Sequence, residues 1–98
     1  MGEPRFEWDP KKARENLRKH RVSFDEARSA FYDEHGGMID DPDHSADEDR
    51  FILLGMSERL RVLVVVHTYR EADQVIRLIS ARRATRPERE QYSERWRP

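Results

Sequence analysis

One long apolar run, residues 61–70, constrains the fold of this 98-residue chain more than any other segment. It reads RVLVVVHTYR, and its valines favour a strand covered on both faces over a helix. A second apolar run at residues 75–81 follows after a short polar gap and leads directly into two arginines. Function is therefore expected where the polar residues of these strand ends converge, namely His67, Arg70, Arg77 and Arg82.

Composition limits the chain to a few classes of protein. With 36% hydrophobic residues the chain can fill one thin core, so we expect a single domain over residues 1–98. There is no apolar stretch long enough to span a bilayer and no N-terminal apolar segment, so we expect a cytoplasmic protein without a membrane partner. The absence of cysteine excludes disulfides, thiolate metal sites and thiol catalysis.

Charge is distributed unevenly between the two halves of the chain. Residues 1–56 carry 9 Lys/Arg against 14 Asp/Glu, whereas residues 57–98 carry 10 Arg against 6 Asp/Glu. The second half is therefore basic, and all of its cations are arginines. Arginine binds phosphate through two parallel hydrogen bonds, which suggests a polyanionic ligand. The alternative is a solvated surface with ion pairs along helix faces.

Local signals predict the order of helices and strands. A short strand around Phe6 and Trp8 precedes a helix that begins at Asp9-Pro10, and residues 23–26 form a capping box that opens a second helix. Strands are expected at 51–56, 61–70 and 75–81, with a further short one at 38–39. Thr85 and Glu88 form another capping box, which opens a C-terminal helix. We therefore predict an α+β domain, a small antiparallel sheet backed by an N-terminal helical hairpin, with a C-terminal helix.

His67 is the first candidate for chemistry, because a histidine titrates near neutral pH and can act as general base or acid. The alternative is a core histidine that donates a hydrogen bond to a carbonyl. Since side chains alternate along a strand, Arg61, His67 and Tyr69 should share one face, and Arg77 should point away from Arg82. The alternative for Arg77 is an ion pair with an acidic helix residue.

Two further polar groups have simpler readings. Lys19 and His20 end the first helix, where cations complement the helix dipole. His44 lies in an acidic segment, but the four histidines have no regular ligand spacing, so no metal site is expected. There is no glycine-rich phosphate loop.

Taken together and in order, these segments resemble the BrnT family of toxins from bacterial type II toxin–antitoxin systems. The matching pieces are residues 6–9, 12, 16, 19–20, 22–24, 26–27, 44–45, 48, 50, 67–70, 77–82, 84, 88–89 and 92. The resemblance implies a RelE-like fold and a ribonuclease that arrests translation without metal or cofactor. It also implies neutralisation by a BrnA-like ribbon-helix-helix antitoxin, with operator DNA contacted only through the antitoxin complex. One departure is Arg21, which stands where the family usually has glycine.

We therefore expect a metal-independent endoribonuclease in which the ribose 2′-hydroxyl attacks its own phosphate. The candidate catalytic residues are His67, Arg70, Arg77, Arg82, Glu48 and Tyr92, and the candidate RNA-binding residues are Lys19, His20, Arg61 and Arg83. Tyr92 also fits core packing by its helical spacing. Two other classes stay open, a non-catalytic interaction module and a DNA-binding co-regulator. No helix-turn-helix signature supports the second, since both N-terminal helices lie in the acidic half.

Overall fold

The computed structural model describes residues 3–39, 50–72 and 74–95, which form a five-stranded sheet with helices on both faces. Its elements are β1 Arg5–Glu7, α1 Pro10–His20, α2 Phe24–Ser29, a 3₁₀ turn Ala30–Tyr32, β2 Gly37–Ile39, β3 Phe51–Met56, β4 Val62–Arg70, β5 Val75–Arg83 and α3 Arg86–Glu94. The predicted α+β class is confirmed. No helix in these described ranges is both long and apolar enough to cross a membrane.

The strand order is β1-β5-β4-β3-β2. Four strands pair antiparallel as expected, whereas β1 pairs with β5 in parallel. The helical hairpin enters the chain between β1 and the other strands, so β1 reaches the far edge of the sheet without a tight turn. The predicted antiparallel sheet therefore has one parallel edge pair.

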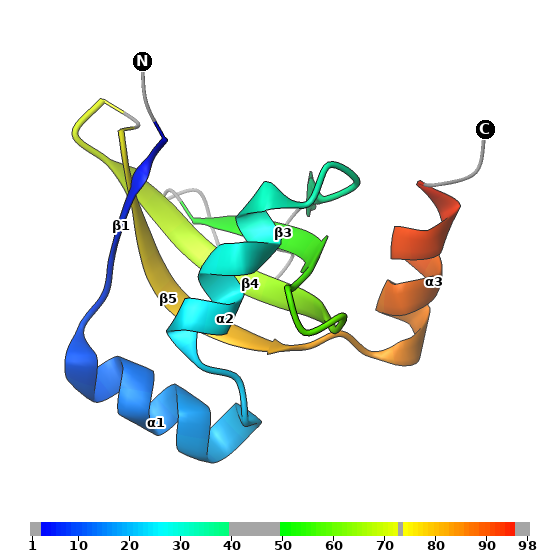
Figure 1. The fold of residues 1–98 in the computed structure, drawn as a ribbon, viewed down its shortest axis with the longest axis horizontal. Helices are drawn as coiled ribbons and strands as arrows, with labels where there is room; N and C mark the ends of the chain where they lie inside the picture. Colours follow the sequence, from blue (N-terminus) through cyan, green and yellow to red (C-terminus); the bar gives the residue numbers. More distant parts are fainter. Residues whose placement is uncertain (1–2, 40–49, 73, 96–98) are drawn as a thin grey trace.

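Each face of the sheet has its own apolar cluster. On one face, Val22, Phe24 and Ala27 of the hairpin segment pack against side chains from three strands, among them Leu63 and Leu78. On the other face, Tyr92 of α3 joins a smaller cluster that contains Ile52, Leu54, Val64 and Ala84. Figure 1 shows α2 across the sheet, α1 below it, and α3 beyond the end of β5 that leads into it.

The helix ends follow the capping signals of the sequence. The Asp9 side chain accepts a hydrogen bond from the Lys11 amide at 3.2 Å, and Thr85 with Glu88 forms a complete capping box. The predicted box at residues 23–26 is only half formed. Ser23 caps the helix, but the Glu26 carboxylate turns inward to Arg61 and Ser57 instead of reaching back to the cap.

Arg21 ends α1 in the left-handed conformation that glycine favours, with φ 59° and ψ 31°. Its amide donates to the Leu17 carbonyl at 2.9 Å, and its own carbonyl accepts from Arg61 at 3.0 Å. The turn therefore keeps its glycine-type backbone despite the bulky side chain. We assign this conformation a cost of about 1 kcal/mol.

A β-bulge in β5 changes which side chains share a face. Val66 pairs with Ser80 but His67 pairs with Leu78, so β5 contains one extra residue at Ile79. Arg77 lies opposite Thr68 and Arg82 opposite Val64, and these two β4 residues point the same way. The expectation that Arg77 points away from Arg82 is wrong, because strict alternation breaks at the bulge.

Candidate nucleic-acid interface

Three arginines of β4 and β5, Arg70, Arg77 and Arg82, lie on the same face of the sheet as α3, and we call this surface the arginine face. At one end of it, Arg70 and Arg77 both contact the Glu7 carboxylate of β1, at 3.1 Å and 3.0 Å. The parallel pairing of β1 with β5 places Glu7 directly beside Arg77. Arg77 therefore forms an ion pair, as the alternative reading had it, but its partner is a strand residue and not a helix residue.

Arg82 occupies the other end of the arginine face. Its two terminal nitrogens donate to the two Glu88 carboxylate oxygens at 2.8 and 2.9 Å, and Glu88 also accepts from the Thr85 amide. Hydrogen bonding to Arg82 is the main cause that lowers the pKa of Glu88 to about 2, and the same pair raises the pKa of Arg82. Arg82 is thus a rigidly held cation with its side chain 41% exposed.

The two ends of the arginine face are separated by five residues of β5, about 15 Å along a strand. Ser80 lies between them on the same face, because it pairs with Val66. A ligand that contacts both ends must therefore be extended, as a nucleic-acid strand is. Arg83, the next residue, pairs with Leu63 and is exposed on the opposite face.

His67 is not brought together with these arginines. It is fully buried on the face that α1 and α2 cover, where the centre of its ring lies 4.8 Å from that of Phe31. Nδ1 is 3.1 Å from the Val65 carbonyl oxygen and Nε2 is 3.4 Å from the Tyr69 hydroxyl. Burial lowers the pKa of His67, against a smaller opposite effect of the Val65 carbonyl. This environment matches the alternative reading, a satisfied core histidine.

Arg61 and Tyr92 also point into the protein. The Arg61 guanidinium binds the buried Glu26 carboxylate, and this contact lowers the pKa of Glu26 and raises that of Arg61. The Tyr92 ring is 2% exposed, and its hydroxyl donates to Asp33. Both residues therefore join distant segments of the fold. Neither presents its polar group to the arginine face.

Lys19 and His20 line a groove between α1 and the edge of β5, which we call the α1–β5 groove. Its other lining residues are Lys12, Glu15, Asn16, Ile79 and Ser80. Since Ser80 belongs to the arginine face as well, the groove adjoins that face. The groove that holds Lys19 and His20 thus lies next to the face that carries Arg77 and Arg82. The RNA-binding role of Lys19 and His20 stays a prediction.

Some functional candidates lie outside the described residues. Glu48 and His44 both fall there, so the catalytic role expected of Glu48 stays a prediction. Within the described ranges, no group of three or more His, Asp or Glu side chains is arranged to hold a metal ion.

Sequence reasoning missed three residues of the site. It quoted Glu7 and Lys12 only within the family resemblance, and it quoted Glu88 there and as a helix cap, but it gave none of the three a role in the site. The spacing of Lys12, Asn16 and Lys19 on one helix face was the available signal for the groove. The role of Glu7 had no local signal, because it is 63 residues from Arg70 in the chain.

Comparison with known proteins agrees with this fold. The 1.1 Å crystal structure of the Brucella abortus ribonuclease toxin BrnT matches 85% of this chain and 99% of its own, with a TM-score of 0.65 and 20% sequence identity. That likeness shows a common fold. No curated relative matches the sequence. The model of the family described as the ribonuclease toxin BrnT of type II toxin–antitoxin systems matches residues 8–88. The chain therefore belongs to the BrnT family of type II toxin–antitoxin ribonuclease toxins.

Proposed function

We propose that this chain cleaves RNA by a metal-independent mechanism, that cleavage arrests translation, and that a BrnA-type antitoxin silences it. The observation that carries the proposal is the arginine face, which aligns Arg70, Arg77 and Arg82 along one extended surface. Arginine remains protonated in all physiological conditions and binds two phosphoryl oxygens at once. A face of this kind suits the backbone of a nucleic-acid strand.

In the proposed reaction the ribose 2′-oxygen attacks the adjacent phosphorus, and the bond from phosphorus to the 5′-oxygen breaks. The 2′-hydroxyl gives its proton to water and the departing 5′-oxygen takes one from water, which leaves a 2′,3′-cyclic phosphate. In the transition state between attack and bond cleavage, extra negative charge develops on the phosphoryl oxygens. Arg77 and Arg82 stabilise that charge, and removal of one such contact typically costs about 2.7–4 kcal/mol.

Proton transfer by His67 has less support than charge stabilisation. The ring is buried on the opposite face of the sheet from Arg77 and Arg82, so a ribose bound to them does not reach it. We therefore assign His67 to the fold in this proposal. The rate enhancement rests mainly on the arginines and on orientation of the strand.

Purified protein incubated with RNA in EDTA, with and without ribosomes, tests the reaction. Cleavage in EDTA and products that end in a 2′,3′-cyclic phosphate are expected. Loss of activity in EDTA, followed by recovery on addition of a divalent ion, contradicts the metal-independent mechanism. The two ribosome arms determine whether cleavage depends on the ribosome.

The antitoxin is proposed to be a BrnA-type protein with a ribbon-helix-helix domain. An acidic or helical segment laid across the arginine face would compete with RNA phosphate for the same cations. Complex formation should then abolish cleavage, and operator DNA should bind through the antitoxin. Co-purification from the host identifies the partner, and gel shifts with operator DNA test the division of roles.

A non-catalytic interaction module is the second candidate function. It is favoured by the fact that all three arginines already have carboxylate partners, because such ion pairs can be purely structural. Growth arrest by an Arg77→Gln variant that is folded but does not cleave RNA would select this candidate.

A further inference from the structure

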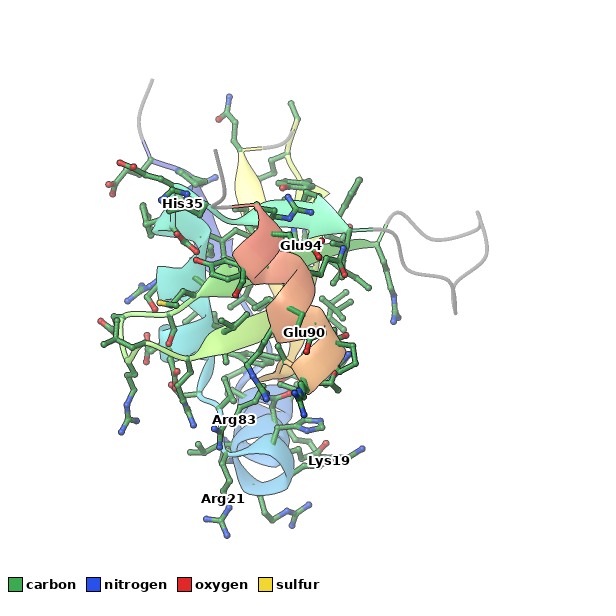
Figure 2. The ribbon with its side chains drawn as sticks, turned by 90° about the vertical axis from the view of Figure 1, so that its right-hand side faces the viewer. Lys19, Arg21, His35, Arg83, Glu90 and Glu94 are labelled. Atoms are coloured by element: carbon green, nitrogen blue, oxygen red, sulfur yellow. The ribbon has the colours of Figure 1, made fainter. Side chains whose placement is uncertain are left out.

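The α1–β5 groove is a second basic surface beside the arginine face. It has a volume of about 250 Å³ and is open to solvent along one side of α1. In Figure 2, Lys19 and Arg21 lie at the end of the molecule that α1 forms, and Arg83 lies between this end and Glu90 of α3. Positive charge is therefore concentrated at this end.

Asn16 holds the groove in a fixed shape. Its buried amide group donates to the Ala81 carbonyl at 2.8 Å and accepts from the Ala81 amide at 3.1 Å, so it pairs with β5 as a neighbouring strand would. It also donates to the Val22 carbonyl at 2.9 Å. These bonds fix α1 against the edge of β5 and keep the groove walls in register.

The floor of the groove is the part of β5 that lies beyond its pairing with β1. On the side of β5 away from β4, β1 pairs with β5 only as far as Arg77. Further along, the Asn16 side chain accepts a hydrogen bond from the Ala81 amide. Among the described strands, none pairs with Ile79 and Ser80 from this side, so backbone polar groups and the Ser80 hydroxyl border the groove. The floor therefore combines the apolar Ile79 with the Ser80 hydroxyl, and cationic side chains of α1 stand beside it.

The walls carry more positive than negative charge. Lys12 and Lys19 are exposed, and neither forms an ion pair with another described side chain. His20 is half-buried beside them, and Glu15 is the acidic residue of the lining. Unlike the three arginines of the arginine face, the two lysines have no carboxylate among the described residues to displace before an anion binds.

We propose that the α1–β5 groove binds a phosphodiester of the RNA strand next to the nucleotide held at the arginine face. The inference rests on the proposed function and extends it by a second phosphate subsite. Ser80 connects the two surfaces, so a strand that crosses β5 between Arg77 and Arg82 passes directly into the groove. Lys12 and Lys19 act as point charges on the phosphate, and the Ser80 hydroxyl donates to it.

Two double variants of the full chain test the proposal. Lys12→Gln with Lys19→Gln removes both cations of the groove. Lys11→Gln with Arg18→Gln is the matched control, because it changes net charge equally, with the same spacing on α1, at residues that line a different surface of the helix. Glutamine preserves helix propensity. Circular-dichroism melts check that both variants are folded.

The probe is a mixed-sequence single-stranded DNA oligonucleotide, which lacks the 2′-hydroxyl and so reports binding without cleavage. Loss of two phosphate contacts should weaken binding about 25-fold at 0.1 M salt and reduce the slope of log affinity against log salt by about 1.4. The control pair should change affinity by less than about threefold, because exposed charges away from the strand are screened.

Equal losses of affinity and of salt slope in both double variants would overturn the groove as a site, since only net charge would then matter. Cleavage of an RNA of the same sequence is measured in parallel, so that a failure of the groove proposal can be told apart from a failure of the proposed ribonuclease function. A wild-type protein that cleaves RNA while the two pairs behave alike refutes the groove alone. A wild-type protein that binds through the groove and does not cleave RNA refutes the ribonuclease mechanism and retains the groove.

Discussion

The buried ring of His67 predicts a specific dependence of stability on pH. Its Nδ1 lies beside the Val65 carbonyl, and aromatic rings of Phe31, Phe51 and Tyr69 surround it. Burial lowers its pKa below the ordinary value of 6.5, so the folded protein holds the ring neutral where the unfolded chain protonates it. Acid should therefore favour the unfolded state.

The magnitude follows from proton linkage. Above pH 7.5 the ring is neutral in both states and the effect is absent. Below 6.5 the unfolded chain binds one more proton than the folded protein, until the pH reaches the folded pKa. The free energy of unfolding should therefore fall between pH 7.5 and 5.5, by up to about 1.4 kcal/mol from this residue alone. Glu26, Asp33 and Glu88 have lowered pKa values, and their losses begin at more acidic pH.

Urea unfolding followed by circular dichroism at a series of pH values measures this effect. A His67→Phe variant keeps an aromatic ring in the cluster and removes the titrating group, so its stability should vary less between pH 7.5 and 5.5. Identical pH dependence in both proteins would refute the buried neutral ring. Loss of RNA cleavage by a folded His67→Phe protein would return His67 to a catalytic role.

Three further predictions concern residues that shape the fold, each measured by urea unfolding. Arg21→Gly should raise the free energy of unfolding by about 1 kcal/mol by relieving the left-handed backbone, and a loss of stability would contradict this strain. Asn16→Ala should lower it by about 3 kcal/mol, because the Ala81 amide and carbonyl lose their partner; a change below 1 kcal/mol would sink that reading. Tyr92→Phe should cost about 1–2 kcal/mol through loss of the hydrogen bond to Asp33, and a neutral result would show that packing alone holds α3.

Local signals in the sequence were sufficient for the order of the elements. Apolar runs located β3, β4 and β5, while Asp9, Ser23 and Thr85 marked the starts of the three helices. These features depend on neighbours within a few positions in the chain, which is why they could be read without the fold.

The prediction that Arg77 and Arg82 point in opposite directions was wrong because no residue near the bulge in β5 signals it in the sequence. Ile79 is a β-branched residue that suits a regular strand, and no glycine or proline accompanies it. Asn16 of α1 pairs with Ala81 just beyond the bulge, which is a contact over 65 residues. The position of Arg77 relative to Arg82 depends on such contacts, so strict alternation could not reveal it.

The partners of the ion pairs could not be predicted from the sequence either. Glu88 was recognised as a cap, but its bidentate contact with Arg82 depends on how the chain turns between β5 and α3. Glu26 was expected to cap its own helix, yet it pairs with Arg61 across 35 residues. The alternative for His67 was stated but not resolved, because the same apolar run is compatible with a buried ring or with one at the strand end.

The central claim is that the charge of Arg82 acts on RNA phosphate and does more than hold Glu88. Single-turnover cleavage of RNA by Arg82→Gln and by Glu88→Gln tests it directly, because both variants break the same ion pair and only one removes the cation. Circular-dichroism melts show that each is folded. We expect a 100- to 1000-fold loss of rate, or about 2.7–4 kcal/mol, for Arg82→Gln and a rate within about threefold of wild type for Glu88→Gln. Equal losses in the two variants would contradict it, since the pair would then serve the fold alone.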